Sequence, residues 1–150
     1  MEQVIEERNI RLQVAARNWE EALEISGGLL VTSNYVKPEY VQMTIDAVKE
    51  LGPYIVIAPG LALAHARPDA SVLKTGISLI TLAKEVEFGS ELGPVKVVIT
   101  LASKDNDVHL DKLQVLAEVF SDESKMEKIC YEKDPAEVAT MLNNNVVDVM

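Results

Sequence analysis

Residues that carry covalent or metal chemistry are scarce in this sequence. Its 150 residues include one cysteine, Cys130, and two histidines, His65 and His109. A single cysteine cannot close a disulfide within the chain, and it cannot build a zinc site from cysteine alone. The histidines lie about forty positions apart, without the close spacing of a metal-binding pair. The sequence also lacks a GxSxG motif and a P-loop. We therefore expect no metal, no serine hydrolase of that type and no P-loop nucleotide site.

Positive charge is also in short supply. The chain has 14 Lys and Arg against 24 Asp and Glu, which gives a formal net charge of -10 and an isoelectric point near 4.6. Nucleic acids and anionic membranes need clustered cations, so neither is expected as the main partner. A basic protein partner fits this charge, because opposite charges steer an encounter.

Long apolar runs are absent as well. The apolar stretch from Val95 to Ala102 is interrupted by Lys96 and is far too short to span a bilayer. The first residues are acidic and do not have the pattern of a signal peptide. We therefore expect a cytoplasmic protein without direct membrane insertion. Its length and the lack of repeats or linkers predict one domain over residues 1–150.

The first third of the chain has clear strand and helix signals. Residues 10–15 alternate apolar and polar side chains, as in a half-buried strand. A helix is predicted from an N-cap at Asn18 to about Val31, although Gly27 and Gly28 weaken it. A second helix is predicted to begin at Pro38 and to stop at Gly52.

The remaining elements complete an alternating pattern. Strands are predicted over residues 54–58, 76–82 and 95–101. Helices are predicted after the cap residues 105–107, with an apolar stripe from Leu110 to Phe120, then around residues 123–130 and from 135 onward. Strands and helices that share one chain favour helices on both faces of a sheet. The predicted fold class is an α/β three-layer sandwich with a mixed, mostly parallel sheet.

The segment PGLALAHARP, residues 59–68, contains the first candidate site. His65 follows an apolar run, and His109 is predicted in the first turn of a helix after a strand. Both are therefore candidates for the rim of the sheet, where such folds place ligands. Arg67 shares a face with His65 if the segment is extended, and a guanidinium beside an imidazole suits phosphate.

A neutral imidazole is a nucleophile near pH 7, provided that an acceptor holds its other nitrogen. That acceptor could be a carboxylate or a backbone carbonyl, and the residues do not decide between them. A histidine taken alone is more often a surface or hydrogen-bonded residue than a nucleophile. The residues alone therefore indicate an α/β domain with a rim suited to anions.

Two motifs in order resemble a known family. The block GPYIVIAPGLALAHARPDASVLKTGISLITL resembles the phosphorylation-site region of the mannitol/fructose-type IIA domains of the sugar phosphotransferase system (PTS EIIA type-2). Within that family it is most similar to the ascorbate-specific branch. The block VEFG followed by PVKVVITLASKDNDVHLDKLQVLAEVF resembles the second half of the family pattern, with its second histidine. The resemblance extends from about Ile10 to Asn144.

The resemblance implies an α/β sandwich and a phosphotransferase that works as a phosphocarrier. His65 would accept a phosphoryl group from phosphohistidine on HPr and pass it to a cysteine of the IIB component, which serves the membrane component IIC. His109 would support the phosphohistidine through a hydrogen bond. No metal, nucleotide or other cofactor is implied. The alternative is a regulatory binding module that senses phosphorylation and does not feed a transporter.

Two departures from the family pattern stand near the motif. Ala64 occupies the place of the usual proline before the active histidine, and Lys49 stands where the mannitol branch has arginine. We retain Arg67 and Lys49 as phosphate-binding candidates, although the ammonium group of Lys49 offers charge without the bidentate hydrogen bonding of a guanidinium. Asp69 and Asp107 are interpreted as turn and cap residues. Cys130 is interpreted as a packed or partly exposed thiol, and Trp19 as a core residue.

Overall fold

The computed structural model describes residues 4–67, 69–104 and 110–149. A short 3₁₀ turn over Glu7–Asn9 precedes the first strand. The strands are β1 (Ile10–Val14), β2 (Val56–Ala58), β3 (Gly60–Ala64), β4 (Gly76–Val86) and β5 (Val95–Ala102). The helices are α1 (Trp19–Thr32), α2 (Pro38–Leu51), α3 (Leu110–Ser121), α4 (Glu123–Tyr131) and α5 (Pro135–Val149).

The five strands form one mixed sheet in the order β1-β4-β5-β3-β2, which places β5 at the centre as its apolar sequence predicts. Strands β1 and β4 pair in parallel, and so do β3 and β5. The pairs β4–β5 and β2–β3 are antiparallel. The mixed sheet is confirmed, but the expected parallel majority is wrong, because two of its four pairs are hairpins with short connections.

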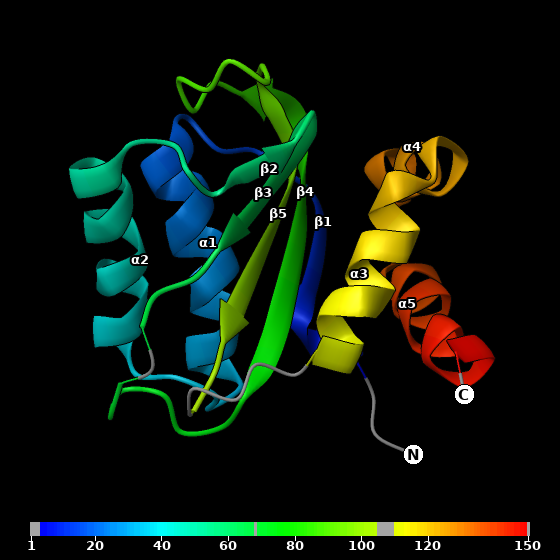
Figure 1. Ribbon diagram of the computed structural model, residues 1–150, viewed down its shortest axis with the longest axis horizontal. Coiled ribbons are helices and arrows are strands. Elements are labelled where there is room, and N and C mark those ends of the chain that lie inside the picture. Colours follow the sequence, from blue (N-terminus) through cyan, green and yellow to red (C-terminus); the bar gives the residue numbers. More distant parts are fainter. Residues whose placement is uncertain (1–3, 68, 105–109, 150) are drawn as a thin grey trace.

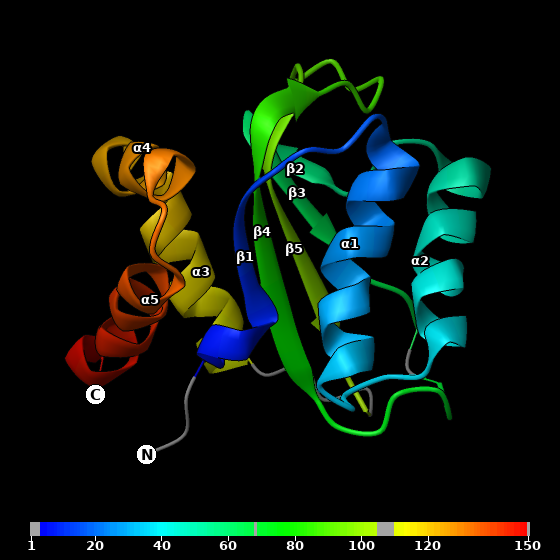
Figure 2. The ribbon, with the colours of Figure 1, turned by 180° about the vertical axis from the view of Figure 1, so that it is seen from behind.

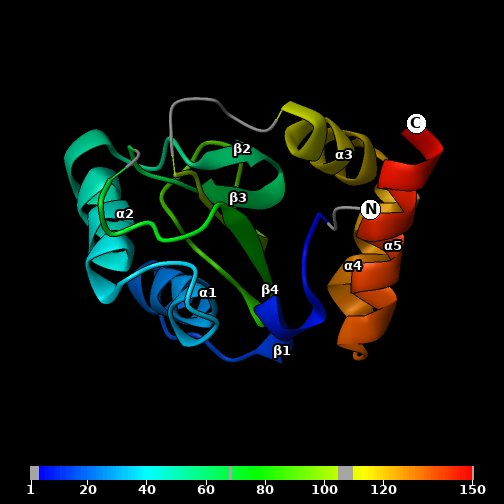
Figure 3. The ribbon, with the colours of Figure 1, turned by 90° about the horizontal axis from the view of Figure 1, so that it is seen from below.

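Helices cover both faces of the sheet, so the predicted three layers are confirmed. Figures 1 and 3 show α1 and α2 on one side and α3, α4 and α5 on the other, and Figure 2 shows the same arrangement from behind. Neighbouring residues of β4 belong to different cores: Leu79 packs on the α3–α5 side and Ile80 on the α1–α2 side. A strand buried on both faces reads as a continuous apolar run, as β4 and β5 do.

The predicted signals at the ends of α1 and α2 are confirmed. The Asn18 side chain accepts a hydrogen bond of 2.9 Å from the backbone N–H of Glu21, as an N-cap does. Pro38 opens α2, and Gly52 ends it with φ +83°. The weakness expected at Gly27 and Gly28 does not interrupt α1, because Gly27 lets α2 approach closely there.

Strand β3 is the element that the sequence patterns do not predict. Pro59 and Gly60 signal a break, and the run that follows is short and rich in alanine. In the structure Gly60 takes φ +82°, and the chain turns back so that β3 pairs with β2 (Figure 1). Leu63 extends this hairpin by donating its N–H to the carbonyl of Ile55 at 2.8 Å. The apolar run before His65 is therefore a sheet strand.

The second half of the chain follows the predicted helices closely. Asp122 caps α4 through Lys125 N–H at 3.1 Å, and Asp134 accepts a hydrogen bond from Ala136 N–H at 3.0 Å at the start of α5. Gln13, at φ +55° on β1, donates its side-chain N–H to the carbonyl of Cys130 at 2.7 Å. This bond ties the end of α4 to the edge of the sheet. Among the described residues, none of the helices combines the length and the apolar character that crossing a membrane requires.

Candidate active site

His65 is the first residue after β3, at the carboxyl end of that strand. The last register pair of the two parallel strands joins Ala64 and Thr100. Because β3 and β5 are parallel, their carboxyl ends lie at the same edge of the sheet, where α/β folds gather functional residues (Figure 1). The structure therefore places His65 on the predicted rim.

The imidazole of His65 has a defined tautomer. Its Nδ1 lies 3.0 Å from the backbone carbonyl oxygen of Leu63. A carbonyl oxygen can only accept a hydrogen bond, so Nδ1 carries a proton, and in the neutral ring the lone pair is then on Nε2. Of the two acceptors that the sequence left open, the structure selects the backbone carbonyl. Nε2 is thus the ring nitrogen that the Leu63 contact leaves available to a partner molecule.

Two tyrosines contact the backbone at His65. Tyr54, in the connection between α2 and β2, donates its hydroxyl to the His65 carbonyl at 3.2 Å. Its ring stands edge-on to the imidazole, with centroids 5.4 Å apart and an interplanar angle of 81°. Tyr40, on α2, accepts a hydrogen bond from Ala66 N–H at 3.1 Å and donates to the Leu101 carbonyl at 2.9 Å. Burial raises the pKa of both phenols, so each stays a neutral donor at physiological pH.

An open cleft runs between His65 and α2. Arg67 lines it beside His65, so the structure brings these two predicted residues together. Two carboxylates of α2, Asp46 and Glu50, give the cleft acidic groups, and Leu51 at its rim is 65 % exposed. The other lining residues are Met43, Ala47, Tyr54 and Ala66. The cleft therefore combines an imidazole, a guanidinium-bearing residue, acidic groups and exposed apolar surface, which suits a docking protein.

The family model for the phosphoenolpyruvate-dependent sugar phosphotransferase system, EIIA 2, matches residues 3–145. The chain belongs to this EIIA family. As a member it is a phosphocarrier component of that system and a phosphotransferase. The chain is 43 % identical over 126 residues to an ascorbate-specific PTS system EIIA component of Salmonella choleraesuis, with 83 % of this chain and 82 % of the relative covered.

Solved structures agree with the assignment to the EIIA family. The solution structure of a mannitol-specific cryptic phosphotransferase enzyme IIA from Escherichia coli superposes with a TM-score of 0.82 at 33 % identity, covering 94 % of this chain and 96 % of that one. A complex of the mannitol enzyme IIA with phosphorylated enzyme IIB from the same organism contains a chain with a TM-score of 0.80 and 31 % identity. The match covers 91 % of this chain and 95 % of that one.

The other residues singled out in the sequence of this EIIA are Lys49, His109, Asp107 and Asp69. Lys49 is not among the residues that line the cleft; its Nζ lies 3.6 Å from a carboxylate oxygen of Glu20 on α1. His109 and Asp107 lie outside the described residues. Asp69 acts as a turn residue, as predicted: it accepts a hydrogen bond of 2.9 Å from Ser71 N–H, and hydrogen bonding by Ser71 lowers the pKa of Asp69.

Cys130 and Trp19, which the sequence assigns to packing, are buried or partly buried in the EIIA fold. Cys130 is 8 % exposed at the end of α4, and burial raises the pKa of its thiol, as expected for a packed cysteine. Trp19 is partly buried against the α1–α2 core and lies 6.3 Å from the ring of Phe88. Within the described part of the chain, no group of three His, Cys, Asp or Glu residues is arranged to hold a metal.

The sequence interpretation missed Tyr54 and Tyr40. Tyr54 was included in a predicted strand over residues 54–58, although the strand begins at Val56. Tyr40 falls in the first turns of α2, where nothing in the pattern sets it apart from core residues. Their residue type is the one usable signal, because a buried tyrosine hydroxyl requires a hydrogen-bond partner.

Proposed function

We propose that this EIIA accepts a phosphoryl group from phosphohistidine on HPr at Nε2 of His65 and then passes it to a cysteine of a IIB component. The single observation that carries this proposal is the hydrogen bond from His65 Nδ1 to the Leu63 carbonyl, at a residue that lines an open cleft. That bond fixes the lone pair on Nε2 before any partner arrives, so the nucleophile needs no further proton transfer.

The chemistry follows from this tautomer. The Nε2 lone pair attacks phosphorus, the N–P bond to the donor imidazole breaks, and the donor nitrogen recovers its electron pair. Nδ1 keeps its proton, and the Leu63 carbonyl stabilises the positive charge that the phosphorylated ring gains. A thiolate of IIB then attacks the same phosphorus, and Nε2 recovers its lone pair. Such transfers depend mainly on positioning and on charge stabilisation.

Arg67 is proposed to contact the phosphoryl oxygens, because it lines the same cleft as His65 and a guanidinium binds phosphate with paired donors. His109 is proposed to support phosphohistidine through a hydrogen bond, as the family pattern implies. The ion pair between Lys49 and Glu20 favours a weaker, indirect part for Lys49, since its ammonium group is already engaged on α1.

The cleft and the net charge support basic, partly apolar docking partners. The chain has a formal net charge of -10, and Asp46 and Glu50 place carboxylates beside the nucleophile. A basic face on HPr would therefore be attracted to this region. The complex of the mannitol enzyme IIA with its IIB supports an analogous contact here. We propose that the chain acts as one domain in the cytoplasm and reaches a membrane IIC component only through IIB.

The ascorbate pathway is proposed as the system that this EIIA serves. The support is the 43 % identity to an ascorbate-specific EIIA component over four fifths of both chains. An EIIA that docks on IIB need not contact the sugar, so specificity is expected to lie in the choice of IIB. The alternative, a regulatory module, predicts a phosphorylated His65 that transfers to no IIB.

The first test is intact-mass spectrometry after incubation with phosphoenolpyruvate, enzyme I and HPr. The wild-type chain should gain one acid-labile phosphoryl group. His65→Ala should gain none, because it lacks the imidazole that lines the cleft and binds the Leu63 carbonyl through Nδ1. His109→Ala serves as the control that retains the nucleophile. Normal phosphorylation of His65→Ala would remove His65 from the proposal.

The second test follows transfer from the phosphorylated chain to IIB proteins of the ascorbate type and of the mannitol type. Wild type should prefer the ascorbate-type IIB. His109→Ala should still be phosphorylated but should transfer more slowly, on the order of 10²-fold, as expected for loss of one preorganised donor. Transfer at the wild-type rate would exclude His109 from the mechanism, and transfer to neither IIB would favour the regulatory alternative.

A further inference from the structure

The peptide that joins His65 to Ala66 is held from both sides by tyrosine hydroxyls. Its carbonyl oxygen, on His65, accepts from Tyr54 at 3.2 Å, and its N–H, on Ala66, donates to Tyr40 at 3.1 Å. The two tyrosines come from different places, α2 and the connection after it. One peptide group thus has both of its polar atoms bound by side chains distant in sequence.

These bonds take over where the regular strand pairing stops. The register of β3 with β5 ends at Ala64 and Thr100, one residue before His65. Tyr40 is 1 % exposed, and its hydroxyl also donates to the carbonyl of Leu101 on β5, so it bridges the two chain segments beyond that point. The same hydroxyl lies 3.4 Å from the Ala66 carbonyl. The backbone at the nucleophile is therefore fixed to β5 without being part of the sheet.

The ring of Tyr54 adds a contact to the imidazole itself. The two rings stand nearly perpendicular, at 81°, with centroids 5.4 Å apart, which is a favourable aromatic geometry. The imidazole is thus held by Leu63 at Nδ1 and by a neighbouring aromatic ring. Tyr54 is 37 % exposed at the cleft, so it reaches His65 without closing the approach.

We propose that Tyr54 and Tyr40 are positioning residues for His65: their hydroxyls fix the His65–Ala66 peptide, and the Tyr54 ring limits rotation of the imidazole. The proposal rests on the proposed function of His65 as the phosphoryl acceptor. A nucleophile held in this way keeps one ring orientation between encounters, so fewer encounters with a partner are lost to unreactive orientations. Tyr54 and Tyr40 act through His65 and are not required to touch the phosphoryl group.

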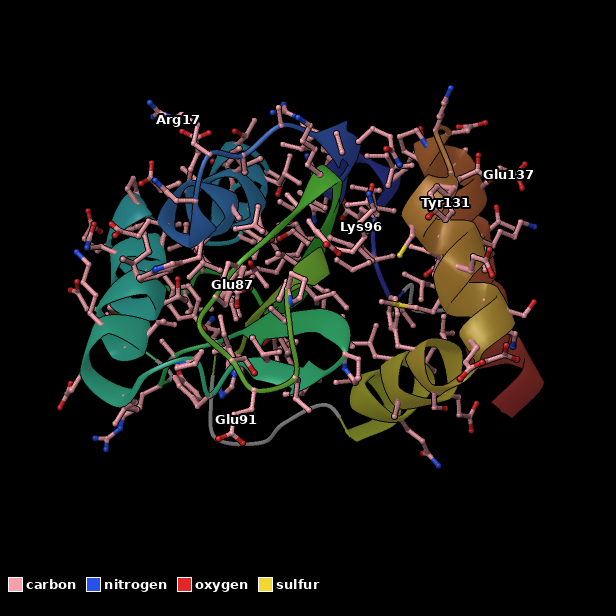
Figure 4. The ribbon with its side chains drawn as sticks, turned by 90° about the horizontal axis from the view of Figure 1, so that it is seen from above. Arg17, Glu87, Glu91, Lys96, Tyr131 and Glu137 are labelled. Carbon is pink, nitrogen blue, oxygen red and sulfur yellow. The ribbon has the colours of Figure 1, made fainter. Side chains whose placement is uncertain are left out.

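The test uses Tyr54→Ala and Tyr54→Phe, with Tyr131→Ala as the matched control. Tyr131 lies on α4, which covers the face of the sheet opposite to α2. It is 68 % exposed, and its ring faces Lys96 (Figure 4). Tyr40→Phe is less suitable alone, because it leaves the part-buried Ala66 N–H and Leu101 carbonyl without this partner and can reduce folding. Two quantities are measured for each variant: the rate of phosphorylation by phospho-HPr, and the long-range ¹⁵N–¹H spectrum of the unphosphorylated imidazole.

Tyr54→Ala should slow phosphorylation by about 10-fold or more and should shift the His65 ¹⁵N pattern toward a mixture of tautomers. Tyr54→Phe keeps the ring and should lose only about 3-fold, in line with one hydrogen bond. Tyr131→Ala should change neither quantity. A wild-type rate in Tyr54→Ala, or a slower rate with an unchanged imidazole spectrum, would overturn the positioning role. If wild type itself is not phosphorylated, the function fails, but the spectrum still decides whether Tyr54 positions the ring.

Discussion

At the scale of single residues, two adjacent glycines of α1 should respond oppositely to the same substitution. A Cβ at Gly27 would lie 2.8 Å from Cγ2 of Val41 on α2, whereas a Cβ at Gly28 would meet nothing within 4 Å. Gly28→Ala should raise the free energy of unfolding by about 0.5–1 kcal/mol, because alanine is the better helix former. Gly27→Ala should lower it by about 1–2 kcal/mol, since the stiff valine cannot yield easily. Urea unfolding of both variants decides this, and equal shifts of the same sign would contradict it.

At this scale the sequence points to the proposed nucleophile, His65, better than to its surroundings. His65 could be singled out because histidine is rare here and because Arg67 lies two positions on. The acceptor of its Nδ1 proton could not be identified, since Leu63 offers a backbone carbonyl and every residue has one. Tyr40 and Tyr54 meet His65 only after α2 and the β2–β3 hairpin have folded, so spacing along the chain carries no sign of them.

At the scale of elements, local chemistry predicts the ends of helices and fails at one hairpin. Asn18, Pro38 and Gly52 act within a few residues of their own positions, and all three mark the ends predicted for them. Strand β3 was missed because alanines carry little strand preference, and its partner β5 is about thirty residues away. Its pairing depends on tertiary contacts. The balance of parallel and antiparallel pairs was missed for the same reason.

At the scale of the whole molecule, a polar cluster joins three segments that are distant in sequence. The Tyr35 hydroxyl, between α1 and α2, donates to Glu6 of the N-terminal segment at 2.5 Å. Lys74, in the segment that leads from His65 to β4, lies 4.7 Å from the Tyr35 ring and 3.9 Å from Glu6. Arg8 also pairs with Glu6. The segment that follows His65 is therefore anchored to the N-terminal segment.

This cluster should make folding stability depend on pH at both extremes. The Tyr35 hydroxyl, followed by Arg8, lowers the pKa of Glu6 from its usual 4.5, so the stability that Glu6 contributes is present above about pH 4.5 and is lost as pH falls through the folded value. Burial, followed by the bond to Glu6, raises the pKa of Tyr35 to about 12, so its contribution is present below its usual 10.0 and is lost as pH rises through 12.

Tyr35→Phe tests this pH dependence while preserving the packing. The ring lies directly over Gly76, where an added Cβ would come within 2.2 Å of it, and phenylalanine keeps that contact. The variant should be less stable than wild type at neutral pH by about 1 kcal/mol, and the difference should shrink at both low and high pH. The measurement is the urea midpoint of both proteins from about pH 3 to about pH 12, so that the low end tests Glu6 and the high end tests Tyr35. Parallel curves would mean that the hydroxyl bond to Glu6 does not couple the three segments to pH.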